Sequence, residues 1–268
     1  MLSATLFTPT AIGLLSLPLC LGLGLVLFLF MELGHRLGCH HRKIDPNSNK
    51  DWVSVVDGPI LALLGLLVAF TFSAAADRFD ARRKLIVDEA NAVGTAYLRL
   101  DLLQPTDRDF LRQKFREYLD SRIKTYALIP DLQAALREFE RSQNLQRDIW
   151  NLAVPATQKT GSPLSGMQLI PALNAMFDIT ITRFAATQFH TPPIVFILLI
   201  ALAVVAALLA GYQMSSSKKR CWIHVSLFVI TFTLAIYVII DLESPRLGLI
   251  RMDATDALLK DVRQSMDQ

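Results

Sequence analysis

Residues 52–103 form the stretch that most restricts what this chain can fold into. An apolar run, Val53 to Ala76, continues without a proline after Ala76 through a charged segment at residues 77–84 and on toward residue 103. At ~1.5 Å per residue, a helix of this length would exceed the ~30 Å hydrocarbon core of a bilayer roughly twofold. The pattern therefore predicts one long helix that crosses a membrane over residues 52–76 and continues outside it to residue 103.

Three more apolar runs are long enough to span a bilayer, and the composition agrees with them. The chain of 268 residues is 52% hydrophobic with a mean hydropathy of +0.38, which is typical of a membrane protein. The predicted fold class is all-α: an integral membrane protein with four transmembrane helices and a central extramembrane helical domain. The expected segments are 11–31, 52–76, 194–212 and 221–240 for the spans, 77–190 for the helical domain, and 241–268 for an amphipathic C-terminal tail.

The orientation in the membrane depends on the basic residues near the spans. Four spans place both termini and the helical domain on one side, and both short loops on the other. The loops and the near-membrane parts of the opposite side each carry seven Lys and Arg, but the loop charges are denser. Because basic loops favour the cytoplasm, charge density predicts a periplasmic helical domain in a bacterial inner membrane. An uncharged Met1–Thr10 predicts a first span that is retained as an anchor.

The spans are also informative for what they lack. No Asp, Glu, Lys or Arg lies between Gly58 and Ala76 or within the third and fourth spans. Coupled transporters usually carry such groups, so the pattern favours a passive pore or a structural protein over a pump. We interpret Asp57, directly before Gly58-Pro59, as a helix N-cap. Catalytic motifs and basic stripes are missing too, so we expect no enzyme, no cofactor and no nucleic-acid partner.

Three groups of polar residues are candidate sites. The first is a set of charges where the second and fourth spans leave the membrane, which can form ion pairs or attract anions to a pore mouth. The second is a polar line on the long helix, and the third is a set of zinc-ligand types in a basic loop expected over residues 32–51, which we interpret mainly as an interfacial loop. The charges at the membrane exit are Arg78, Arg82, Arg83, Asp241, Glu243 and Arg246. The polar line comprises Glu89, Asn91, Thr95 and Arg99. The zinc-ligand types are His35, Cys39, His40 and His41.

Four motifs carry a resemblance to a known family. They are AFTFS at residues 69–73, RFDARR at 78–83, EANAVGTAYLRL at 89–100 and DLESPRLG at 241–248. The chain resembles a bacterial bestrophin-like family of unknown function, which is distantly similar to the bestrophin anion channels. No counterpart of the calcium clasp of animal bestrophins is found in the sequence.

The resemblance implies a function and a site. It implies a homo-oligomer, a pentamer by analogy, whose second helices line a pore for small inorganic ions, with an apolar gate at Phe70, Leu66 and Ala62. It also implies anion conduction and a cytoplasmic helical domain, against the charge density. The leading hypothesis is therefore an oligomeric ion channel in the lipid bilayer. The alternative is a structural or sensory membrane protein whose helical domain binds a partner without conduction.

Overall fold

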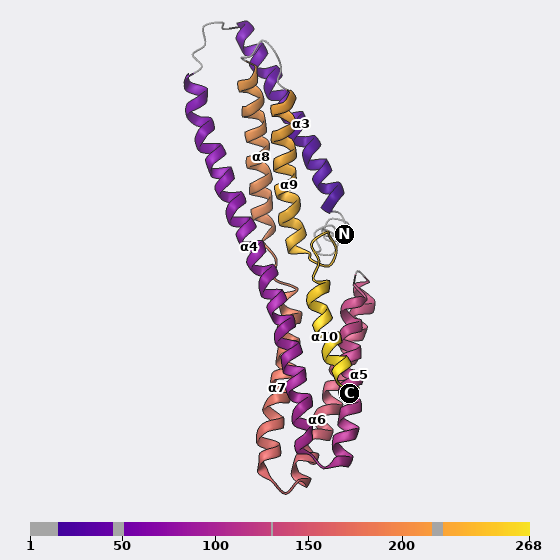
Figure 1. Cartoon of the computed structure of the whole chain (residues 1–268). Helices are drawn as coiled ribbons and strands as arrows, with labels where there is room; N and C mark the ends of the chain where they lie inside the picture. The colour runs from indigo at the N-terminus through magenta and orange to yellow at the C-terminus, as the bar shows by residue number, and fades with distance from the viewer. Residues whose placement is uncertain (1–15, 45–50, 130, 216–221) are drawn as a thin grey trace. The chain divides into compact units, whose positions relative to one another are not determined.

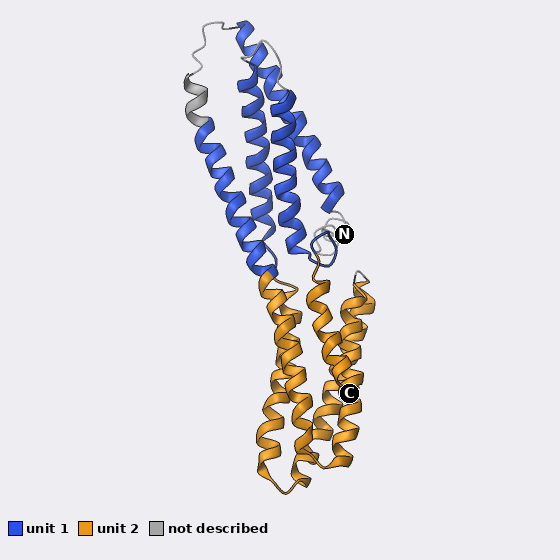
Figure 2. Cartoon of the chain, viewed as in Figure 1, with its two compact units in different colours: residues 1–79, 190–250 blue, residues 80–189, 251–268 orange. Residues whose placement is uncertain are grey.

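The computed structural model describes residues 16–44, 51–129, 131–215 and 222–268, and regular structure in these ranges is helical. The chain forms two compact units, shown separately coloured in Figure 2. Unit 1 comprises Met1–Phe79 and His190–Ile250, and unit 2 comprises Asp80–Phe189 and Arg251–Gln268. The helices, labelled in Figure 1, are α3 (Ser16–Ile44), α4 (Asp51–Leu98), η1 (Arg99–Leu102), α5 (Pro105–Ala127), α6 (Leu132–Lys159), α7 (Pro163–Ala186), α8 (Pro193–Met214), α9 (Trp222–Glu243) and α10 (Asp253–Ser265).

Four of the described helices are long and apolar enough to cross a membrane: α3, α4, α8 and α9. Their apolar windows have mean hydropathies between 2.1 and 3.1, far above the chain average. Most side chains in these windows are not covered by the chain itself, as expected for helices in contact with lipid. The predicted fold class is thereby confirmed, although residues 11–15 of the expected first span and Cys221 of the fourth lie outside the described residues.

Helix α3 is longer than the sequence predicted. The loop expected over residues 32–51 is wrong for residues 32–44, because α3 continues to Ile44 and carries an Arg36–Glu32 ion pair along its surface. Close contact with α8 accounts for this extension. A Cβ on Gly34 would collide with the Leu208 carbonyl, and one on Gly211 would collide with the Met31 carbonyl. Small residues that let two membrane helices approach this closely stabilise their association.

Helix α4 covers nearly the whole stretch expected to be one helix. It runs for 48 residues from Asp51 to Leu98 and tightens into the 3₁₀ turn η1, which ends at Leu102. Pro59 is accommodated inside it. Asp57 lies six residues after the helix start, so its interpretation as the N-cap is wrong. Its buried carboxylate instead accepts a hydrogen bond from Gln213 of α8.

Unit 2 is a helical bundle with its own apolar core. Helices α4, α5, α6 and α7 bury side chains such as Val93, Phe115, Ile149 and Leu173 against one another. The apolar side of α10, including Leu259, packs into the same core. The end of α10 is held by the Met266 carbonyl, which accepts hydrogen bonds from the Tyr97 hydroxyl (3.1 Å) and from Arg116 Nη2 (2.8 Å). The part of the expected tail from Arg251 on is therefore an integral part of unit 2, whereas residues 241–250 belong to unit 1.

Candidate functional site

Helix α4 of unit 1 has a packed side and an uncovered side. Leu64, Val68 and Ala75 pack against residues of α8 and α9. Thr71 joins the packed side, where its hydroxyl donates within α4 to the Leu67 carbonyl at 2.8 Å. Leu66 and Phe70 are 52% and 64% exposed, so more than half of the surface of each is left uncovered.

The uncovered side changes character along its length. Ala62, Leu66 and Phe70 follow one another at four-residue intervals, so they share one side of the helix. Exposed Ser73 and Asp77 continue this side at the next two turns. The structure thus brings the predicted gate residues onto a common exposed face that begins apolar and becomes polar.

Two of the charged residues predicted at the membrane exit, Arg78 and Glu243, lie together in one cluster. Arg78 and Glu243 form an ion pair, with Arg78 Nε 3.0 Å from Glu243 Oε1. The Thr191 hydroxyl donates to the same carboxylate oxygen at 2.6 Å, and His190 Nδ1 lies 3.4 Å from its other oxygen. This cluster joins the middle of α4 and the end of α9 to the segment directly before α8. His190, which the sequence left unassigned, thus belongs to it.

Asp241 plays a different part from the one expected. Its two carboxylate oxygens accept hydrogen bonds from the backbone amides of Leu249 (3.1 Å) and Ile250 (2.7 Å). The prediction that it pairs with an arginine is therefore wrong for the described residues. A Cβ on Gly248 would collide with this carboxylate, which explains the glycine in the motif DLESPRLG. Asp241 closes the turn after α9, and Arg246 lies half-buried in that turn.

The remaining two exit arginines lie in unit 2 or at its edge. Arg82 is buried and donates to the backbone carbonyls of Ala186 (3.2 Å) and Phe189 (2.8 Å), so it anchors the end of α7 to α4. Arg83 is exposed and lies 3.4 Å from Asp80 on the same helix. These contacts are local, and both lie within unit 2.

The predicted polar line on α4 divides between two sides of the helix. Asn91 and Thr95 are exposed, and Arg99 donates to the Gln168 carbonyl of α7 at 2.6 Å. Glu89 instead points into the core of unit 2, where its side chain has no exposed surface. Its position two residues before Asn91 places it on a different face of the helix.

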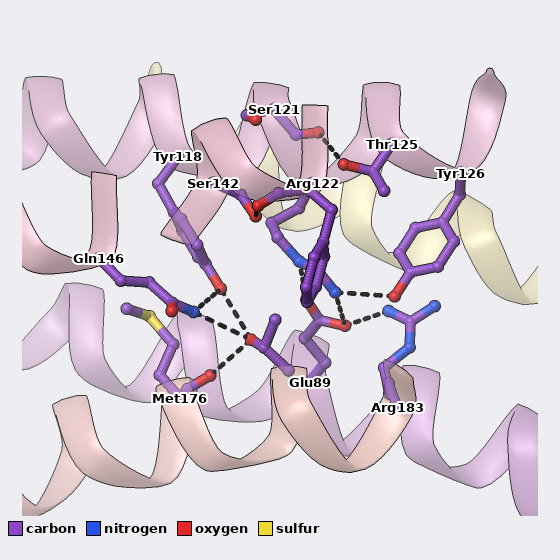
Figure 3. A network of polar contacts seen from close by, with 12 residues as sticks. Glu89, Tyr118, Ser121, Arg122, Thr125, Tyr126, Ser142, Gln146, Met176 and Arg183 are labelled. Carbon is purple, nitrogen blue, oxygen red and sulfur yellow. Dashed lines mark hydrogen bonds and ion pairs between the residues drawn. The ribbon is translucent and has the colours of Figure 1, made fainter. Parts of the chain in front are cut away.

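Glu89 lies at the centre of a buried network that the sequence did not predict (Figure 3). Arg122 Nε of α5 is 2.7 Å from Glu89 Oε1, and Arg183 of α7 pairs with the other carboxylate oxygen. The Tyr126 hydroxyl accepts from Arg122 Nη2 at 2.7 Å, and the Arg183 guanidinium carbon lies 4.1 Å from the centre of the Tyr126 ring. Side chains from three helices thereby meet on one carboxylate.

The charges in this network favour the ionised forms of Glu89 and Arg122. Glu89 lies 13 residues beyond Ala76, which is about 20 Å along a helix and outside the apolar span. Burial alone would raise its pKa, but Arg122 and Arg183 hold the pKa of the Glu89 carboxyl below its ordinary value. Burial likewise disfavours charged Arg122, yet Tyr126 and Glu89 hold the pKa of Arg122 above its ordinary value. The ion pair is therefore charged at neutral pH.

A neutral hydrogen-bonded group continues the network in the same core. The Tyr118 hydroxyl is 3.0 Å from the Thr180 hydroxyl, and the Gln146 amide donates to both at 3.2 Å. These side chains come from α5, α6 and α7 and are fully or almost fully buried. Buried polar groups that satisfy one another fix how helices align, because any slip would leave them unpaired. We interpret the whole network as the element that sets the register of unit 2.

The four zinc-ligand types at residues 35–41 do not assemble into a site. They lie on successive turns of α3, where Cys39 Sγ is 3.7 Å from His35 Nε2 and His41 Nδ1 is 2.9 Å from the Tyr212 hydroxyl. Within the described parts of the chain, no three His, Cys, Asp or Glu side chains are grouped so as to hold a metal ion.

Taken together, four membrane-spanning helices, an α4 that runs on into a helical bundle, and the exit motifs define a class of all-helical integral membrane protein. The model of the bestrophin-like domain matches residues 23–256, which is most of the chain. The chain therefore belongs to the bestrophin-like family. Comparison with curated proteins and with solved structures returned no match.

Proposed function

We propose that copies of this chain assemble into a ring in a cell membrane and conduct ions passively, with α4 lining the path. In this arrangement Ala62, Leu66 and Phe70 face the axis, and Phe70 forms the apolar constriction. The family gives this proposal its starting point, because bestrophins are oligomeric anion channels. A bacterial inner membrane and a pentamer remain expectations from analogy.

The uncovered side of α4 is the observation that carries the proposal. A helix side that met only lipid would remain apolar to the membrane surface. Here the exposed line that starts with Leu66 and Phe70 already carries the Ser73 hydroxyl within the span, and the Asp77 carboxylate follows directly after the span ends. A change from apolar to polar along one line is typical of a helix that lines a water-filled path.

The chemistry of the spans supports passive conduction. In α8 and in α4 between Gly58 and Ala76 there is no ionisable acid or base that a proton- or sodium-coupled cycle could use. An apolar ring in such a path can stop ions by excluding water, and widening it lets water and ions through. Phe70 is the largest exposed side chain on the proposed line, so it is the natural position for this ring.

Phe70→Ala and Phe72→Ala provide a matched test in proteoliposomes. Both phenylalanines are exposed and lie two residues apart, so they point to different sides of α4. We expect Phe70→Ala to raise ion flux well above wild type and Phe72→Ala to leave it unchanged. Equal effects of the two substitutions would overturn the gate assignment. No flux from either variant would overturn conduction itself.

One observation favours the alternative, a protein that binds a partner without conducting. Unit 2 exposes large apolar side chains at Leu98 (69%), Met167 (72%) and Leu164 (53%), and the Arg99–Gln168 hydrogen bond brings η1 and α7 together beside them. Stoichiometry separates the two functions. A ring of three or more copies whose α4 helices enclose an axis supports the channel, whereas a monomer, or a dimer with α4 toward lipid, supports the alternative.

A further inference from the structure

The charged side chains that follow the span on α4 differ in whether they form ion pairs or hydrogen bonds with other residues of the chain. Arg78 is held by Glu243 and Thr191, and its side chain is 28% exposed. Arg82 is 7% exposed and is engaged by the carbonyls of Ala186 and Phe189. Both guanidiniums are thus directed into the chain, on the packed side of α4. Neither is placed to attract an anion to the uncovered side.

The acidic residues on the same segment are placed differently. Asp77 is exposed, and it forms no ion pair with any residue in the described ranges. It lies seven residues, or two helical turns, after Phe70, so the two side chains project from the same side of α4.

Within unit 1, the charge closest to Phe70 along α4 is the Asp77 carboxylate, seven residues after it. In unit 2, Asp80 and Arg83 form an ion pair with each other at 3.4 Å.

We infer that the path selects small inorganic cations over anions, with a ring of Asp77 carboxylates next to the apolar constriction as the selecting element. Rings of carboxylates concentrate cations and repel anions, and repetition of Asp77 in every copy multiplies the effect. This selectivity rests on the proposed channel function, and it opposes the anion conduction that the resemblance implies.

Reversal potentials of the full-length protein in planar bilayers test this inference. Under a potassium chloride gradient, wild type should reverse near the potassium equilibrium potential. Asp77→Asn should shift the reversal potential toward zero, and Asp77→Lys should shift it to the chloride side. Asp77→Glu should keep the wild-type value. Asp109→Asn is the control, because Asp109 is an exposed carboxylate on α5, away from the α4 line.

The outcomes separate this inference from the channel proposal. Currents that reverse near the chloride potential in wild type would overturn cation selectivity while leaving conduction intact. Cation selectivity that survives Asp77→Asn and Asp77→Lys would overturn the assignment to Asp77. If neither wild type nor Phe70→Ala carries current, conduction fails, and the selectivity inference fails with it.

Discussion

Glu89 and Arg122 form an ion pair that is completely enclosed by unit 2. The distance from Arg122 Nε to Glu89 Oε1 is 2.7 Å, and neither side chain has exposed surface. Arg183 shares the same carboxylate, so one negative charge is in contact with two guanidiniums. A carboxylate in this position is costly to remove, because its loss would leave two buried guanidiniums without the negative charge that they share.

Glu89→Gln should therefore destabilise the protein strongly. The substitution keeps the shape of the side chain but removes the charge that Arg122 and Arg183 share. We expect the free energy of unfolding to fall by about 3–5 kcal/mol, measured by thermal or denaturant unfolding of the full chain in detergent. The control Asp109→Asn removes an exposed partner of Arg108 and should cost less than about 1 kcal/mol. Equal losses of unfolding free energy in the two variants would show that the buried Glu89 ion pair stabilises the protein no more than an exposed pair does.

The pH dependence of the unfolding free energy should reveal the contribution of ionised Glu89. Because the pKa of Glu89 is lowered in the folded state, its stabilising contribution is complete above the ordinary glutamate value of ~4.3. The contribution is lost as the pH falls through the lower folded-state pKa. The difference in unfolding free energy between wild type and Glu89→Gln should thus be constant from about pH 6 to 8 and shrink below about pH 4. A constant difference down to pH 3 would contradict this.

The contact between α3 and α8 predicts a sharp difference between two glycines. Gly211→Ala places a methyl group against the Met31 carbonyl, whereas a Cβ on Gly22 of α3 meets nothing within 4 Å. Overpacking of a close contact costs typically about 1–3 kcal/mol, so Gly211→Ala should lower the melting temperature in detergent. Gly22→Ala should leave it unchanged or raise it slightly. An unchanged melting temperature in Gly211→Ala would mean that α3 and α8 can move apart at little cost.

Asp241→Ala should loosen the turn after α9. The substitution leaves the amides of Leu249 and Ile250 without their acceptor, at a cost of about 1–3 kcal/mol. We expect faster proteolysis within residues 244–250 together with lower thermal stability. Asp253→Ala is the matched control, because that carboxylate is exposed and pairs with exposed Arg251. Unchanged proteolysis in Asp241→Ala would rule out its part in closing the turn.

The sequence predicts four helices that are long and apolar enough to cross a membrane, and the described residues contain four such helices, because this property depends on length and composition alone. It predicts the common face of Ala62, Leu66 and Phe70 as well, because helical spacing is visible in the residue numbers. Which side of α4 the chain covers depends on contacts with α8 and α9, so it had to come from the structure. The extension of α3 to Ile44 was missed for a similar reason, because Gly34 and Gly38 are stabilised by α8 and not by local propensity.

The buried network shows where local pattern gives too little information. Glu89 is 33 residues from Arg122 and 94 residues from Arg183, and no spacing rule connects positions so far apart. A signal was nevertheless present. Arg122 lies between Leu119 and Ile123 in the apolar helical pattern of α5, and Arg183 lies beside Phe184 on α7. Charged residues on buried faces predict a partner, although they do not identify it.

The anchored Met266 carbonyl has a practical consequence for studies of this protein in cells. It accepts hydrogen bonds from Tyr97 on α4 and from Arg116 on α5, only two residues before Gln268. A bulky label attached at residue 268 would lie only two residues from these bonds, so a flexible spacer is needed. With such a spacer, a small dye at residue 268 would report whether α10 stays in place when the membrane environment changes.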